Sequence, residues 1–219
     1  MNTETPVRVL LLSDGKPGHM SNSTGVLKAM RKVAPVEHTV LHCRLRLKFL
    51  RYPLRWLLNR PGGPARLPAR AQRALLRVAY ALDAPRLAGG GQPFDWILSA
   101  GGDTSFLNAW LATLLGAKNA YSSSLRGLRP SLFTLLFAYG EPLPGADHAI
   151  TLPLIPTPIE RAAVAAQGRA FRERHGLGGE PLWAVLIGGN GAGYRYTRRD
   201  MEQLAAALPA LAQRHGARL

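Results

Sequence analysis

The sequence contains a single cysteine, Cys43, so no disulfide can form within the chain. A lone thiol is typical of proteins from a reducing compartment. No apolar run reaches the roughly 18 residues that a membrane-spanning helix needs. The apolar stretch 7–12 is too short for the central region of a secretion signal, and Asp14 follows it closely. These absences predict a cytoplasmic protein.

Acidic residues are also scarce, since 13 Asp and Glu stand against 28 Lys and Arg, for a net charge of +15. The surplus is concentrated between Arg44 and Arg86, where eleven basic residues accompany one acid, Asp83. This concentration predicts an anionic partner, either nucleic acid or anionic lipid. The alternative is that these basic residues form a solvated face of an arginine-rich protein and bind no partner. No nucleic-acid-binding motif accompanies the charge, so we expect no specific nucleic-acid partner.

The opening of the chain has the pattern of a strand, a loop, a helix and a second strand. The apolar run 7–12 ends at a Ser-Asp-Gly turn, which is typical of a buried strand. Residues 21–24 offer N-cap side chains to a helix that Pro35 closes, and 36–41 alternates like a strand. We therefore predict a parallel strand pair within an α/β sheet of the Rossmann type.

The segment 44–86 interrupts this pattern as a basic helical insert. On a helix, Arg44, Lys48, Arg51 and Arg55 share one face and leucines take the other, with a kink or break expected at Pro53. A second basic helix carries Arg70, Arg73 and Arg77. We predict that an anionic membrane surface contacts three of these basic residues and an aromatic neighbour: Lys48, Arg51, Arg55 and Trp56.

Further strands are predicted at 94–99, 117–122, 132–138 and 149–154, which completes an N-terminal domain over 1–155. A linker helix, with Pro158 at its first position, falls within 156–180. Residues 181–219 predict a strand at 183–187, a helix capped by Thr197 with Asp200, a kink at Pro209 and another strand beginning at 217. Since one βα unit cannot form a sheet, we expect the truncated start of a second Rossmann-like domain. The alternative is that this unit joins the edge of the first sheet.

Three loops, at 13–19, 99–105 and 188–195, share one design, in which an apolar strand leads through a glycine-rich turn into a helix. Glycine allows positive φ and a close approach of the backbone, and a helix start offers free N–H groups to a phosphate. Such loops meet at the carboxyl ends of parallel strands, although glycine after a strand is often plain turn chemistry. No loop matches a nucleotide-triphosphate or NAD motif. The candidate phosphate-binding residues are Gly15, Lys16, Gly18, Ser21, Gly101, Gly102, Thr104, Ser105, Gly188, Gly189, Asn190, Tyr194 and Arg195.

His19 and Asp14 are the candidate catalytic residues. His19 stands where a helix is expected to begin, and it could act as a general base or bind a pyrophosphate. Asp14 would orient it; alternatively, both side chains only cap the local backbone. Arg195, between two tyrosines, could clamp a phosphate or simply pack on the surface. The six histidines are scattered, and no metal-ligand spacing is present.

Four stretches resemble the mitochondrial-fission Elm-like family, which has many bacterial members and has loosely been labelled nucleoside-diphosphate-sugar epimerase. They are the first loop at 13–19, the Ser-Ala-Gly-Gly turn at 99–102, the segment 124–133, and the third loop at 186–196. That family resembles the GT-B glycosyltransferases, in which two Rossmann-like domains face each other across a cleft. The first loop is also similar to the Gly-Gly-His loop of the lipid-linked glycosyltransferase that makes peptidoglycan precursor.

The resemblance implies a glycosyltransferase that uses a nucleotide-sugar donor, with a lipid-linked acceptor at the inner face of a membrane. Gly15, Gly18 and His19 would face the phosphates, the 101–105 loop would lie beside them, and the loop from Gly188 to Arg195 would open the donor domain. Family members continue beyond the last helix of this sequence, so we expect most of the donor pocket to be missing. One alternative is a non-catalytic module that binds a membrane surface or a partner. Another is a kinase, because 99–108 resembles the Gly-Gly-Asp-Gly-Thr loop of NAD and lipid kinases, with Thr104 in place of the last glycine.

Overall fold

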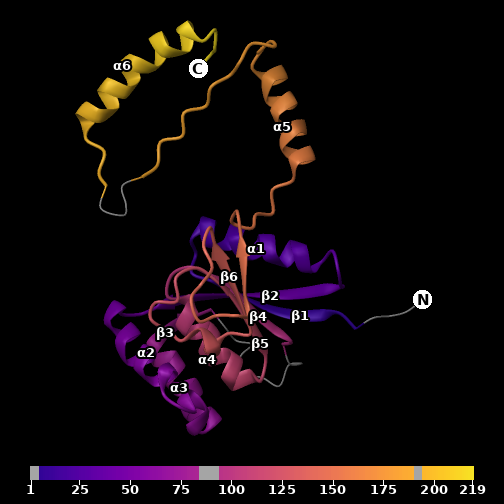
Figure 1. Cartoon of the computed structure of the whole chain (residues 1–219), viewed down its shortest axis with the longest axis vertical. Helices are drawn as coiled ribbons and strands as arrows, with labels where there is room; N and C mark the ends of the chain where they lie inside the picture. The colour runs from indigo at the N-terminus through magenta and orange to yellow at the C-terminus, as the bar shows by residue number, and fades with distance from the viewer. Residues whose placement is uncertain (1–4, 84–93, 190–193) are drawn as a thin grey trace. The chain divides into compact units, whose positions relative to one another are not determined.

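The computed structural model describes residues 5–83, 94–189 and 194–219, and a seven-stranded sheet forms the core of its N-terminal part (Figure 1). The strand order is β3-β2-β1-β4-β5-β6-β7, and every neighbouring pair is parallel except β2 with β3. This arrangement confirms the predicted Rossmann-like α/β fold and the parallel pairing of the first two strands. The strands are β1 (Val7–Ser13), β2 (Val36–Leu45), β3 (Tyr80–Leu82), β4 (Trp96–Ala100), β5 (Lys118–Ser122), β6 (Leu135–Tyr139) and β7 (Ala149–Leu152).

Helices cover both faces of this sheet. Helix α1 lies on one face, and α2, α3 and α4 lie on the other (Figure 1). Residues 84–93, which precede β4, lie outside the described residues. The helices are α1 (Pro17–Met30), α2 (Arg51–Asn59), α3 (Ala69–Ala79), α4 (Thr104–Leu115), α5 (Arg161–Arg174) and α6 (Arg198–Arg214), with short 3-10 turns η1 (Lys48–Leu50), η2 (Gly63–Arg66) and η3 (Pro130–Leu132).

Helix α1 begins earlier than predicted. Its first residue is Pro17 and its N-cap is Lys16, so the expected N-cap residues 21–24 lie inside the helix, with Ser21 half-buried. Proline suits this position because its fixed φ is helical and its missing N–H is not needed there. Gly25 in the middle of the helix has a packing role, since a Cβ on it would stand 2.8 Å from the Cα of Thr157.

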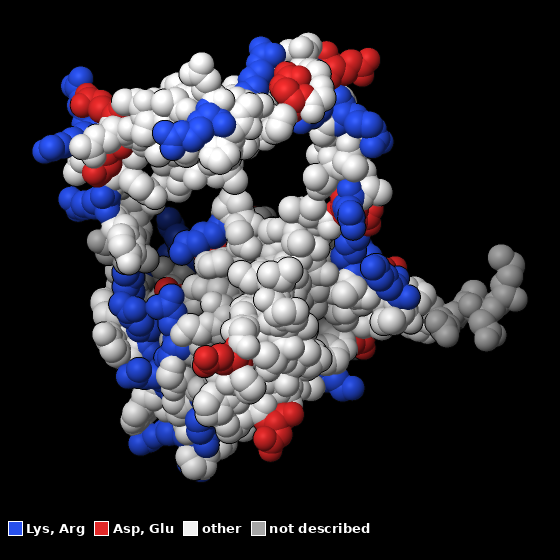
Figure 2. Space-filling model, turned by 45° about the horizontal axis from the view of Figure 1, so that its top comes forward, with Lys and Arg blue, Asp and Glu red and all other residues white. Residues whose placement is uncertain are grey.

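The basic insert differs from the prediction in three respects. Arg44 belongs to strand β2 and Lys48 to η1, so only Arg51 and Arg55 of the predicted four lie on helix α2. Pro53 falls in the first turn of α2, where it costs no intrahelical hydrogen bond and does not break the helix. The second basic helix is confirmed as α3. Basic side chains gather along the lower left of Figure 2, over α2 and α3.

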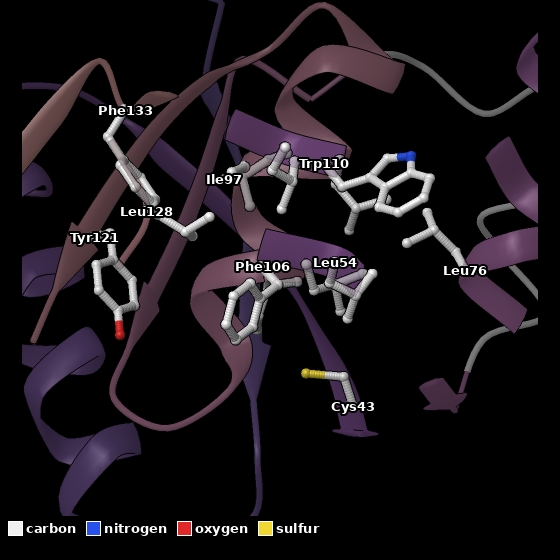
Figure 3. Close-up of a cluster of buried hydrophobic side chains, with 14 of the residues drawn as sticks. Cys43, Leu54, Leu76, Ile97, Phe106, Trp110, Tyr121, Leu128 and Phe133 are labelled. Carbon is white, nitrogen blue, oxygen red and sulfur yellow. The ribbon is translucent and has the colours of Figure 1, made fainter. Parts of the chain in front are cut away.

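Two hydrophobic clusters hold the layers together, because alternate residues of a strand point to opposite faces. On β1, Val9 and Leu11 pack with α1, whereas Leu10 and Leu12 join the larger cluster beneath α2, α3 and α4. Figure 3 shows this larger cluster, in which the Trp110 indole of α4 lies beside Leu76 of α3. The indole N–H donates a 3.0 Å hydrogen bond to the Gln72 side chain, which ties α3 to α4.

The chain divides into two compact units, residues 1–159 and 160–219. In the second unit, α5 begins at Arg161 with Glu160 as its N-cap, so the predicted start at Pro158 is wrong. Helix α6 has the predicted capping box of Thr197 and Asp200 and continues through Pro209. No described helix is both long enough and apolar enough to cross a membrane.

The predicted strand at 183–187 is wrong. An isolated parallel bridge joins Leu182 to Arg218, held by two backbone hydrogen bonds of 2.8 Å, and residues 183–187 are not part of a paired strand. A strand needs a neighbour that pairs with it along its length. Within this unit, the apolar run therefore stays largely exposed, with Leu186 93% accessible.

Candidate functional site

The first two predicted loops meet at one edge of the sheet. β1 and β4 are parallel neighbours, with Leu10 opposite Ile97, and both loops leave from the carboxyl ends of these strands. The helix after β1 covers one face of the sheet and the helix after β4 covers the other. Such a point, where the strand order reverses, opens a crevice that binds ligands in many α/β proteins.

An acid–imidazole pair occupies this crevice. Oδ2 of Asp14 lies 2.9 Å from Nδ1 of His19, and Oδ1 accepts a 3.2 Å hydrogen bond from the Lys16 N–H. A carboxylate can only accept, so in the neutral imidazole this contact favours the tautomer with its proton on Nδ1 and a lone pair on Nε2. The imidazole side chain is 31% accessible and the carboxylate 15%. The imidazole can therefore reach a ligand while Asp14 holds its orientation.

Gly101 and Gly102 provide the space in which the pair lies. Their φ angles are +67° and +62°, in the region that favours glycine. A Cβ at Gly101 would overlap the His19 ring at Cδ2 and Nε2, and one at Gly102 would stand 2.6 Å from Oδ2 of Asp14. The glycines of the second loop thus accommodate the catalytic candidates of the first.

The sequence predicts that Thr104 and Ser105 face the crevice, but in the structure they do not. Both side chains are buried in the first turn of α4, and the Thr104 hydroxyl donates a 2.7 Å hydrogen bond to the Gly101 carbonyl. Thr104 therefore stabilises the glycine turn. The backbone carbonyl of Asp103 accepts a hydrogen bond of 2.7 Å from the Tyr80 hydroxyl, which fixes the same turn from the side of β3.

A cavity of about 570 Å³ opens on the side of the pair that faces β5 and β6. Its polar residues include His19, Asn22, Tyr139, Glu141 and the run 122–124, and we call it the serine pocket. At its base, Nδ2 of Asn22 donates to Ser122 Oγ at 2.8 Å and to the Tyr139 hydroxyl at 3.0 Å. Sequence reasoning missed this pocket, because Asn22 and Tyr139 are 117 positions apart.

Ser123, at the mouth of the serine pocket, has an unusual backbone. Its φ is +145°, a region that residues other than glycine rarely adopt. Strained residues of this kind cluster at binding sites, where the surrounding structure holds them in place. The only sequence signal for it was the run of three serines at the end of a strand.

A second cavity, of about 400 Å³, lies on the opposite side of Asp14, between the first loop and the ends of β2 and β3. We call it the arginine pocket, because Arg44 and Arg46 line it together with Gly15; the carboxylates of Asp14 and Asp83 line it too. Nε of Arg46 is already engaged by the carbonyls of Arg77 and Tyr80, whereas Arg44 is exposed. The alternation of basic residues along β2 is the signal that could have revealed this pocket.

Two other titratable groups near the crevice stay neutral. Burial raises the pKa of the Cys43 thiol to about 12, and the nearby charge of Asp14 adds to the effect. Burial likewise raises the pKa of the Tyr121 hydroxyl to about 12. Neither group can supply an anionic nucleophile near neutral pH.

The third predicted loop belongs to the second unit. Gly188, Gly189, Tyr194 and Arg195 are all exposed within it, and Asn190 lies outside the described residues. Among the described residues, no three His, Cys, Asp or Glu side chains come close enough to hold a metal ion.

The predicted membrane-facing residues are mostly exposed. Lys48, Arg55 and Trp56 are accessible, whereas Arg51 is half-buried. The Arg60 guanidinium lies 3.5 Å from the centre of the Trp56 ring, and a hollow of about 660 Å³ runs between Tyr52, Trp56 and Arg60. Phe49 and Tyr52 are 61% and 57% accessible, so aromatic and basic side chains alternate on this surface.

Fold and crevice together define a Rossmann-like α/β protein with an acid–imidazole pair at its topological switch point. Comparison of the chain with protein-family models, with curated proteins and with solved structures gives no match. The resemblance to the Elm-like family therefore stays a prediction from the sequence.

Proposed function

We propose that this protein is a GT-B-like glycosyltransferase that takes a nucleotide-sugar donor, with His19 as its general base. The contact between Asp14 and His19 carries the proposal, because it leaves Nε2 of a half-exposed imidazole free to accept a proton. The pair lies where open α/β sheets bind nucleotides and other small ligands. The resemblance of the first loop to glycosyltransferase loops selects sugar transfer among the reactions that a histidine base can serve.

The proposed step involves one bond formed and one broken. Nε2 of His19 accepts the proton of an acceptor hydroxyl while that oxygen bonds to the anomeric carbon of the donor sugar. The bond from the anomeric carbon to the phosphate oxygen breaks, and the nucleoside diphosphate leaves with the electron pair. Asp14 stabilises the imidazolium that forms, as a carboxylate does beside a histidine base.

The donor phosphates would lie at the entry to α1, on the side of Gly15 and the arginine pocket. The first-turn N–H groups of this helix have no carbonyl within the helix to bond to. They stand at the positive end of a 14-residue helix, and the exposed Lys16 adds a full charge. This arrangement favours a leaving diphosphate.

The test is turnover with a panel of uridine, guanosine, adenosine and thymidine diphosphate sugars, measured as nucleoside diphosphate released in the presence of neutral sugar or lipid-linked acceptors. We expect His19→Gln to lower turnover by roughly 100-fold or more. His38→Gln, which removes an exposed histidine of β2, is the matched control and should retain activity. Equal turnover in the two variants would exclude His19 as the base. Nucleotide-sugar binding without any turnover would favour the non-catalytic module.

The buried hydroxyls of the second loop count against the kinase alternative. The hydroxyls of Thr104 and Ser105 are not directed at a ligand in this loop, since Thr104 bonds to the Gly101 carbonyl and Ser105 is enclosed. We therefore prefer transfer from a nucleotide sugar to transfer of a phosphoryl group.

We further propose that α2 and its flanks rest on an anionic membrane surface. The support is the combination of exposed aromatic rings and arginines, which suits the boundary between headgroups and acyl chains. The apolar side chains Leu47 and Phe49 are also exposed beside Lys48, and apolar insertion is a feature of membrane contact rather than of nucleic-acid contact.

Co-sedimentation with vesicles tests this second proposal. Binding should require phosphatidylglycerol, weaken with salt, and fall roughly five-fold for each cation removed in Lys48→Gln and Arg55→Gln. Arg161→Gln and Arg169→Gln on α5 remove the same charge elsewhere and should have little effect. Equal losses in both pairs would mean that net charge alone drives binding, and preferential binding of single-stranded RNA would replace the membrane proposal.

A further inference from the structure

We infer that the serine pocket is the acceptor site and takes a neutral, hydroxyl-rich ligand such as a sugar, while the anionic part of the donor lies on the other side of His19. The inference rests on the proposed function and adds to it the class of ligand that each side of the crevice accepts.

The charge of the serine pocket is the first observation. The chain carries 28 Lys and Arg, yet none of those in the described residues lines this cavity, where the described charged side chain is the carboxylate of Glu141. Phosphate or carboxylate ligands would be repelled there. The arginine pocket, across Asp14, contains the cations Arg44 and Arg46 beside the carboxylates of Asp14 and Asp83, so an anion could meet a cation there but not in the serine pocket.

The chemistry of the lining is the second observation. Side chains with hydroxyl and carboxylate groups pair with neighbouring hydroxyls of a sugar as donors and acceptors, and the serine pocket supplies both through Ser124 and Glu141. Leu136, Phe137 and Leu143 form an apolar wall. A few convergent polar groups on an apolar wall are the usual pattern of a small-molecule site, and a volume of about 570 Å³ is within its range.

The base of the pocket is rigid, which is the third observation. Asn22 on α1, Ser122 on β5 and Tyr139 on β6 are joined by hydrogen bonds, so three separate elements hold the floor in one geometry. His19 lies one helical turn before Asn22 and lines the same cavity. A hydroxyl of a ligand on this floor would therefore be within reach of the base.

Ligand-observed NMR on the full chain tests the inference. The probes are glucose, N-acetylglucosamine and cellobiose, followed by saturation-transfer difference, and inorganic pyrophosphate, followed by phosphorus line width. We expect Glu141→Gln to weaken saccharide binding roughly five-fold, because the amide oxygen that replaces the carboxylate accepts a weaker hydrogen bond, and to leave pyrophosphate binding unchanged. Arg44→Gln should weaken pyrophosphate binding and leave saccharide binding unchanged. Glu173→Gln, on α5, removes a carboxylate outside the pocket and is the matched control.

Other outcomes would overturn the inference. Pyrophosphate that displaces a saccharide, or that binds more tightly to Glu141→Gln, would place the anion in the serine pocket. Stronger binding of glucosamine than of glucose, lost in Glu141→Gln, would make the ligand a cation. Absence of saccharide binding also overturns it, yet leaves the proposed transferase standing if donor turnover depends on His19.

Discussion

The carboxylate of Asp14 lies directly against Gly102, so close that a Cβ at that glycine would stand 2.6 Å from Oδ2. The same carboxylate atom is the one that contacts Nδ1 of His19. The geometry of the acid–imidazole pair therefore depends on a residue of the second loop that carries no functional group.

Gly102→Ala should displace Asp14 and uncouple it from His19. We expect a cost of about 1–2 kcal/mol in the free energy of unfolding from the left-handed backbone, together with loss of donor turnover. Gly116→Ala is the matched control, since its φ is +64° and a Cβ there meets nothing within 4 Å. Denaturant unfolding and turnover would be measured for both variants. A Gly102→Ala protein with full turnover would show that the pair tolerates displacement.

Asp14→Asn should alter the tautomer of His19. Without the carboxylate, the imidazole loses the acceptor that keeps its proton on Nδ1, and turnover should fall by roughly 10-fold or more. Nitrogen chemical shifts of the imidazole would report the tautomer independently of activity. An unchanged tautomer with reduced turnover would mean that Asp14 acts on the substrate instead.

Cys43 should be inert in the folded protein. Its thiol is buried and its pKa is about 12, so a disulfide reagent at about pH 8 should react only after unfolding. Because the folded pKa lies above the ordinary value of 9.0, the folded state holds this proton more tightly than the unfolded state does. The resulting stability is complete below about pH 9 and is lost as the pH rises toward 12. Cys43→Ala should reduce this alkaline loss, which denaturant titrations across that range would measure.

The hydrogen bond between Trp110 and Gln72 should show strong coupling. Trp110→Phe leaves the Gln72 carbonyl oxygen buried without its partner, and we expect a loss of about 1–3 kcal/mol beyond the change in packing. Gln72→Leu leaves the indole N–H unpaired and also removes the hydrogen bond to the Leu67 carbonyl. The double variant should lose less free energy of unfolding than the two single variants lose in total, as a denaturant double-mutant cycle would measure. Strict additivity would mean that this hydrogen bond contributes nothing net.

Local patterns predicted much of the sheet correctly. Apolar runs that end in Gly or Ser turns mark β1, β4 and β5 close to their observed bounds, because strand burial and turn chemistry are local properties. The prediction of a strand at 183–187 is wrong because strand pairing is not a local property. Its composition is that of a strand, but a strand also needs a partner that the pattern does not contain.

The features of the candidate site also fall into those that follow from the sequence and those that depend on the tertiary structure. The amino-acid sequence by itself determined the Rossmann-like order of elements, the concentration of positive charge, and the presence of Asp14 and His19 in a loop after the first strand. Only the tertiary structure decided that Gly101 and Gly102 enclose this pair, that Thr104 turns inward, and that Asn22 meets Tyr139 at the base of a pocket. These contacts join residues from separate strands and helices, and their geometry arises when the sheet packs against both helical layers.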